Sequence, residues 1–186
     1  MGTTTIVLIV CGVIILFLIL SYNRLVKLRN NRENAFADID VQLKQRYDLI
    51  PQLVETVKGY AKHEKDTLAK VVELRNQAVA ASSIDDKINA ENQLSGLLSG
   101  LRVTLEAYPE LKANQNFMQL QEEMSDIENK LAAVRRYFNS ATKEMNNAVQ
   151  AFPSNIIASM FSFKKAEMFD LGSDRATLDQ APKVNF

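Results

Sequence analysis

The sequence offers few side chains that could do chemistry, and their spacing does not bring them together. It contains one histidine, His63, and one cysteine, Cys11. A serine hydrolase needs a histidine held between a serine and a carboxylate, and a di-iron bundle needs Glu-x-x-His on two helices. Tyr60 stands three residues before His63, and Cys11 lies in an apolar run. We therefore predict that the chain is not an enzyme and that His63 is a solvated polar residue, with a ligand-binding role as the alternative.

Composition excludes further classes of function. No glycine-rich phosphate loop and no zinc-ligand spacing occurs. Lys and Arg number 22, as do Asp and Glu, so the balanced charge does not favour nucleic acid as a partner. We predict no cofactor, no bound metal and no nucleic-acid binding. Only 6 glycines and 4 prolines are present, which favours a helical chain.

The densest polar stretch precedes Pro51 and includes Asp38, Asp40, Arg46 and Asp48. On a helix, Asp40 and Lys44 would form an i,i+4 pair. One interpretation is a solvated helix face. The other is an interaction face, for self-association or an unknown protein partner, on which Arg46 pairs with a carboxylate from another chain.

The N-terminus has the pattern of a membrane anchor. Residues 6–20 carry no charge, and the flanking Thr, Ser and Tyr residues extend the uncharged stretch to about 20 residues, or about 30 Å as a helix. A cleaved signal peptide would have a basic start and a cleavage site with small residues, and "MGTTT" and "ILS" provide neither. We predict an uncleaved transmembrane anchor at 1–22, with residues 6–22 in the lipid bilayer.

The charges that follow the anchor predict its orientation. Four basic residues precede the first acidic residue, Glu33: they are Arg24, Lys27, Arg29 and Arg32. Because basic residues are retained on the cytoplasmic side, we expect the N-terminus outside and the C-terminal body in the cytoplasm.

The remaining chain has the periodicity of long helices. Between 114 and 152 the apolar residues step by three and four throughout, which indicates five heptads. Their positions are Phe117, Leu120, Met124, Ile127, Leu131, Val134, Phe138, Ala141, Met145, Ala148 and Phe152. A second helix is predicted at about 85–108, capped by Ser83 or Asp85. A third is predicted from the membrane to about residue 81, with an imperfection near "KHEK".

Pro51 lies inside that third helix. Proline removes one backbone hydrogen bond, to the carbonyl of Tyr47, and costs about 3 kcal/mol in a straight helix. Leu43, Ile50 and Val57 keep one face across it. We therefore predict a helix kink at Pro51 rather than a helix end.

Short connections between these helices predict an all-α, elongated, antiparallel up-and-down bundle of three to four coiled-coil-like helices. The bundle would occupy 23–162 and be followed by an extended or loosely docked tail at 163–186. Just before the tail, "SNIIASMFSF" places Ile156, Ile157, Met160 and Phe161 on one helical face. We expect this short helix to close the bundle end. Contact with the membrane surface is the alternative, and the lack of a basic polar face argues against it.

Long stretches of the sequence resemble the LemA family of bacterial membrane-anchored proteins. They include "YNRLVKLRNNRENAFADIDVQLKQRYDLIPQLVETVKGYAKHEKDTLAKVVELRN", "YPELKANQNFMQLQEEMSDIENKLAAVRRYFN", "FPSNIIASMF" and "APKVNF". The resemblance implies one N-terminal span in the bacterial inner membrane, a short external N-terminus and a cytoplasmic helical bundle. It implies no catalytic or ligand-binding residues, and the molecular role of the family is unsettled. Some relatives carry a lipoprotein cysteine close before "YN". Cys11 lies too far upstream of "YN" for the resemblance to imply that this chain is lipidated.

Two functions fit these features. The first is a membrane-anchored structural or scaffolding protein that forms homo-oligomers, up to a large array, through its long helices. The second is an adaptor or regulator of a membrane-associated partner, such as an envelope-stress protease.

Overall fold

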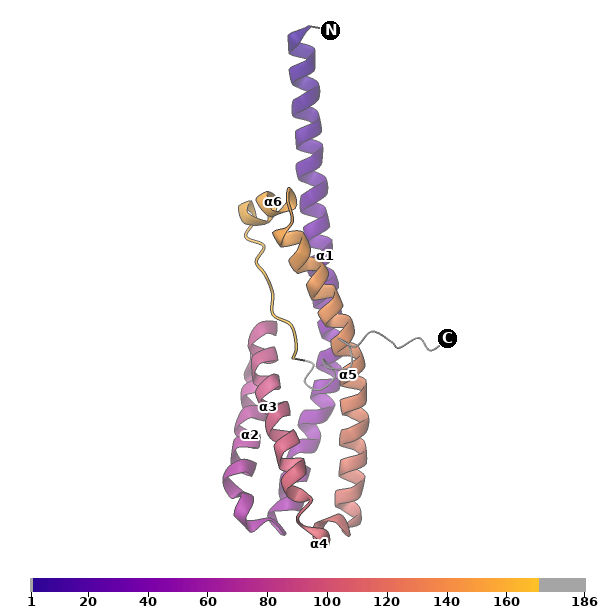
Figure 1. The fold of residues 1–186 in the computed structure, drawn as a ribbon, viewed down its shortest axis with the longest axis vertical. Helices are drawn as coiled ribbons and strands as arrows, with labels where there is room; N and C mark the ends of the chain where they lie inside the picture. Colours follow the sequence, from indigo (N-terminus) through magenta and orange to yellow (C-terminus); the bar gives the residue numbers. More distant parts are fainter. Residues whose placement is uncertain (1, 171–186) are drawn as a thin grey trace, which may run out of the picture.

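The computed structural model describes residues 2–170, which form an elongated bundle of helices (Figure 1). The elements are α1 (Thr3–Lys58), the short 3-10 helix η1 (Lys62–Glu64), α2 (Lys65–Ala80), α3 (Ile84–Leu105), α4 (Pro109–Lys112), α5 (Gln115–Gln150) and α6 (Ser154–Met160). No strand occurs among the described residues. The predicted all-α class is confirmed.

Four long helices alternate in direction along the rod. α1 runs from the N-terminus to the far end, α2 returns, α3 descends again, and α5 rises beside α1 (Figure 1). α5 packs mainly on α1, and α2 packs mainly on α3. The α2–α3 hairpin covers only the half of α1 that lies far from the N-terminus. The predicted antiparallel bundle is therefore built from two helix pairs.

α1 is one continuous helix of 56 residues, or about 84 Å at 1.5 Å per residue. Its first part is long and apolar enough to cross a membrane by length and composition, and no residue of its most apolar window is buried in the structure. Burial begins at Leu25 and continues on one face to Val57. The same helix thus carries the apolar segment and one wall of the bundle.

The helix predicted to continue to residue 81 is interrupted, so that prediction was wrong. α1 ends at Lys58, the chain turns through Gly59, Tyr60 and η1, and α2 runs back along the bundle. The apolar spacing is misleading because both Val57 and Val71 are fully buried and stand two heptads apart. Gly59 followed by the polar "KHEK" is the local signal for the end of a helix.

Two local caps explain where the later helices begin. The Asn114 side chain accepts a hydrogen bond from the backbone N–H of Phe117, and α5 starts at the next residue. Ser83 does the same for the N–H of Asp86 at the start of α3. Most of the predicted heptad seam of α5 is buried, whereas its last member, Phe152, is 80% exposed beyond the helix end.

The tail begins docked along the bundle. Residues 163–170 have no regular secondary structure and run back beside α5. The Asn146 amide bonds both the N–H and the carbonyl of Ala166, and the Asn139 amide bonds both groups of Phe169. The Phe169 ring packs against Phe36 and Phe138 in the core. Residues 171–186 of the predicted tail lie outside the described part of the chain.

Candidate functional site

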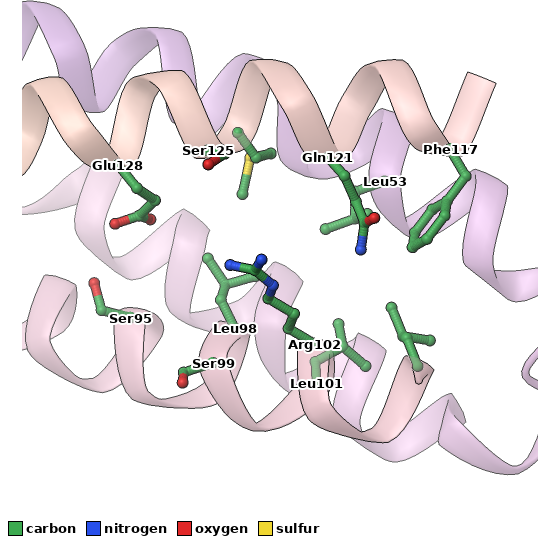
Figure 2. Close-up of a pocket in the computed structure, with 12 residues that line it drawn as sticks. Leu53, Ser95, Leu98, Ser99, Leu101, Arg102, Phe117, Gln121, Ser125 and Glu128 are labelled. Carbon is green, nitrogen blue, oxygen red and sulfur yellow. The ribbon is translucent and has the colours of Figure 1, made fainter. Parts of the chain in front are cut away.

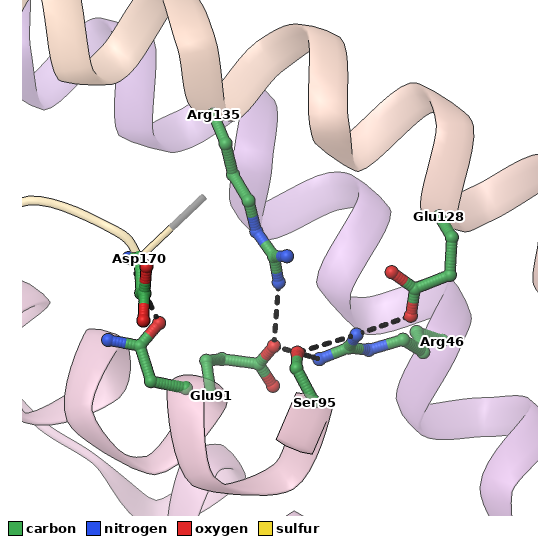
Figure 3. A network of polar contacts seen from close by, with 7 residues as sticks. Arg46, Glu91, Ser95, Glu128, Arg135 and Asp170 are labelled. Atoms are coloured by element: carbon green, nitrogen blue, oxygen red, sulfur yellow. Dashed lines mark hydrogen bonds and ion pairs between the residues drawn. The ribbon is translucent and has the colours of Figure 1, made fainter. Parts of the chain in front are cut away.

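A buried ion-pair network joins three helices at the middle of the bundle (Figure 3). Arg46 of α1 is fully buried and pairs with Glu91 of α3, which is also fully buried. A second Arg46 nitrogen lies 2.6 Å from the Glu128 carboxylate of α5. Ser95 of α3 accepts a hydrogen bond from Arg46 at 3.1 Å, and Arg135 of α5 reaches Glu91 at 3.3 Å.

The network is electrically balanced, with two arginines against two glutamates. Burial lowers the pKa of Arg135, and the nearby positive charge of Arg46 lowers it further. For Arg46, burial acts in the same direction, but the carboxylates of Glu91 and Glu128 outweigh it, and its pKa is raised. Burial, reinforced by Glu91, raises the pKa of Tyr47 well above its usual range. Tyr47 is therefore neutral and both arginines are charged at neutral pH.

The residues of the predicted interaction face do not share one environment, because Arg46 is buried whereas Asp38 and Asp48 are exposed. The hypothesis that Arg46 pairs with another chain was wrong, because both of its carboxylate partners lie in its own chain. Asp40 pairs with Lys87 of α3 at 2.6 Å instead of with Lys44. Asp38 and Asp48 are exposed, and Asp48 pairs with Lys44 at 3.4 Å. Asp38 and Asp48 remain candidates for contact with a partner, and the Asp40 side chain is half exposed beside Lys87.

Glu91 was not among the predicted site residues, although the sequence contains a signal for it. Ile88, Leu94, Leu98 and Leu101 form the apolar stripe of α3, and Glu91 occupies a position within that stripe. Arg46 likewise occupies the stripe of α1, between Leu43 and Ile50. Charges of opposite sign in the buried stripes of two helices predict a buried pair between those helices.

Below the network, α3 and α5 are separated by a groove with a volume of about 300 Å³ (Figure 2). Its lining is leucine-rich on the α1 and α3 side and includes Phe117 and Met124 of α5. Polar side chains also line it, among them Ser99, Ser125 and Gln121, and Arg102 reaches from α3 toward α5. From Ser95 to Leu105, the groove follows about 15 Å of α3. The lining therefore combines apolar and polar side chains, and no feature of the sequence predicted the groove.

The basic residues after the apolar segment are not equivalent. Arg24, Lys27 and Arg29 are exposed. Arg32 is buried in the bundle, where it pairs with Asp85 at 2.5 Å and lies over the Phe138 ring. The prediction that Arg32 is one of the membrane-flanking charges therefore needs correction, because its charge is matched inside the fold.

Pro51 and His63 both lie outside the buried ion-pair network, and both are exposed. α1 stays helical through Pro51, as predicted, and Pro51 is exposed. His63 is exposed in η1, away from the buried network. Among the described residues, no group of three or more His, Cys, Asp or Glu is placed to hold a metal ion.

The geometry defines a class of protein: a helical rod whose longest helix extends into an apolar segment and whose core holds a largely buried ion-pair network. The LemA family model matches residues 35–186, and the chain belongs to the LemA family. It is 26% identical over 168 residues to Protein LemA of Metamycoplasma hominis, covering 88% of this chain and 75% of that protein.

Magnetosome proteins are more distant relatives. The chain is 20% identical over 178 residues to the magnetosome protein MamQ of Magnetospirillum gryphiswaldense, and equally so to MamQ 2 of Paramagnetospirillum magneticum. Each match covers 82% of this chain and 65% of the relative, so the chain spans just under two thirds of the MamQ length. None of these names denotes an enzyme.

Proposed function

We propose that this protein is a membrane-anchored scaffold that self-associates through its helical rod. The observation that carries the proposal is the continuity of α1, which joins the apolar segment to the bundle without a linker. A bundle mounted in this way keeps a fixed direction relative to the bilayer. Neighbouring copies would then stand side by side, with their lateral faces at high local concentration.

The groove between α3 and α5 is the contact surface that we assign to self-association. It lies on the side of the rod and is elongated, so a helix of a second, parallel copy could lie along it. Leu98 and Met124 are partly exposed in the groove and would then leave water, which favours association by about 25 cal/mol per Å² of apolar surface. Phe117 and the other leucines of the lining are already buried in the single chain. The buried network serves this role indirectly, because Arg46 holds α3 and α5 through Glu91 and Glu128 at one end of the groove.

A matched pair of substitutions tests this assignment. Ser125 and Ser140 are both exposed on α5, but only Ser125 lines the groove. Ser125→Asp should reduce the oligomers of the full-length protein in lipid nanodiscs, measured by mass photometry, and Ser140→Asp should not. Equal oligomer populations in both variants and the parent protein would exclude the groove as the contact surface.

The proposed orientation has the N-terminus outside the bacterial inner membrane and the bundle in the cytoplasm. The exposed charges of Arg24, Lys27 and Arg29 support it. A cysteine at Ser140, in a Cys11→Ala background, should resist membrane-impermeant maleimide in intact cells and react after lysis. Labelling in intact cells would reverse the orientation.

The exposed carboxylates Asp38 and Asp48 favour a second candidate function, that of an adaptor for a membrane-associated partner such as an envelope-stress protease. Charge reversal with Asp38→Lys and Asp48→Lys should then abolish a crosslink to a different protein. Under the scaffold proposal, the same reversal leaves the homo-oligomer intact, so the two functions are distinguishable.

A further inference from the structure

Where the apolar segment of α1 meets the bundle, the structure exposes several large apolar side chains. They belong to the corner after α5 and to α6: Phe152 is 80% exposed, Ile156 52%, Met160 67% and Phe161 54%. Ile157 and Ala158 are buried against α1 and α5, so α6 has one buried side and one exposed apolar side. The single apolar face predicted for Ile156, Ile157, Met160 and Phe161 is thus divided, with only Ile157 directed inward.

A ring contact and a shared hollow place this corner beside the end of the apolar segment. The ring of Phe161 lies 4.7 Å from that of Tyr22, centroid to centroid, at the end of the uncharged stretch. Phe17 and Ser21 of α1 line a hollow of about 330 Å³ together with Phe152 and Pro153. Phe17 precedes Tyr22 by five residues, or about 7.5 Å along a helix. The corner therefore overlaps the last turns of the segment that would lie in the bilayer.

Basic side chains surround the same end of the bundle. Arg24 lines the hollow, which Glu144 also lines, and Arg29 lies over the Phe163 ring at 5.4 Å. Lys164 and Lys165 follow Phe163 and are both exposed. Helix α6 itself has no basic face, but α1 and the tail provide the positive charge that an anionic lipid surface attracts.

From these observations we infer that the α5–α6 corner, through Phe152, Ile156, Met160 and Phe161, is a membrane-docking surface that inserts into the headgroup and outer acyl region of the bilayer. Interfacial helices bury their apolar face to a depth of about 5–10 Å. The corner overlaps α1 from Phe17 to Tyr22, a length of about 7.5 Å, which agrees with that depth. A second copy of the chain is the competing occupant, but the ring contact with Tyr22 and the hollow shared with Phe17 and Ser21 place this surface at lipid level. The inference rests on the proposed membrane anchor and adds a second attachment, which would fix the rotation of the rod about α1.

The absence of tryptophan from the chain permits a clean test. Phe152→Trp and Met160→Trp are each made in the full-length protein and reconstituted into nanodiscs of phosphatidylcholine and phosphatidylglycerol. The lipids are either unlabelled or brominated near the headgroup end of the acyl chains. Val103→Trp is the control, since Val103 is 68% exposed near the opposite end of the rod. Val10→Trp reports on the anchor itself.

The inference predicts that Phe152→Trp and Met160→Trp lose most of their fluorescence in brominated lipid and resist quenching by aqueous iodide, whereas Val103→Trp does the reverse. If Val10→Trp is quenched by brominated lipid but Phe152→Trp and Met160→Trp are quenched by iodide, the anchor holds and the docking surface is refuted. Protection of these two tryptophans from both quenchers would mean that protein covers the corner, which also refutes the inference. Failure of Val10→Trp to respond to brominated lipid would refute the anchor itself.

Discussion

Arg75 of α2 donates a hydrogen bond from its Nε to the backbone carbonyl of Tyr47 in α1, at 3.2 Å. In an uninterrupted α-helix this carbonyl accepts from the residue four positions later, which here is Pro51. Because proline has no N–H, the carbonyl is free to bond outside the helix. The proline in the middle of α1 therefore creates an attachment point for α2.

This relationship predicts an energetic coupling between Pro51 and Arg75. Arg75→Met keeps the apolar stem but removes the donor, and should lower the free energy of unfolding by about 1–2 kcal/mol. In a Pro51→Ala background, the helix supplies its own donor, and the cost of Arg75→Met should fall by about 1 kcal/mol. Urea unfolding of the four proteins in detergent, followed by circular dichroism, measures the coupling. An identical cost in both backgrounds would show that the two residues act independently.

The buried network should be sensitive to the loss of one member. Arg46→Met leaves Glu91 buried with Arg135 as its remaining ion-pair partner, so the free energy of unfolding should fall by about 3–5 kcal/mol. Lys44→Met is the control, because the Lys44–Asp48 pair is exposed and is expected to contribute less than about 1 kcal/mol. Comparable losses in the two variants would show that the Arg46 network does not hold the helices together.

Tyr47 should make the fold sensitive to alkali. Its pKa is raised in the folded state, so its contribution to stability is complete below the unfolded value of about 10 and declines as the pH rises above that value. Between about pH 10 and 11, the free energy of unfolding should fall more steeply for the parent protein than for Tyr47→Phe. Parallel stability profiles, determined by urea titration at each pH, would argue against a neutral, buried Tyr47.

The asparagine contacts should control access to the start of the tail. Asn146→Ala removes two hydrogen bonds to Ala166, so trypsin should cut after Lys164 and Lys165 faster than in the parent protein. The neighbouring Asn147→Ala is the control, since Asn147 is exposed. Mass spectrometry of timed digests measures both rates. Equal cleavage in the two variants would indicate that the amide of Asn146 does not hold the tail.

Local periodicity predicted most of the helices, because burial of one face imposes a three-and-four spacing along the chain. It predicted α5 and α3 closely, and it correctly kept α1 helical through Pro51. It failed between Val57 and Val71, where two separate helices present buried valines two heptads apart to the same core. An apolar register shows which face is buried but does not show whether the chain has reversed direction.

The candidate site was harder to predict than the helices. Arg46 and Glu91 are 45 residues apart, and their contact depends on how α1 and α3 are arranged in space. Their presence in apolar stripes was visible in the sequence and would have placed Arg46 inside the fold. The groove depends on the spacing of α3 and α5, which packing against α1 and α2 sets, so no local pattern encodes it.

Association of the anchored rods with one another can be counted copy by copy in the membrane. The measurement is single-molecule photobleaching of the full-length protein, with one fluorophore on each copy in native-membrane nanodiscs. Self-association predicts particles with two or more bleaching steps, and a shift toward single steps with Ser125→Asp but not with Ser140→Asp. Single steps in the parent protein at every expression level would contradict it.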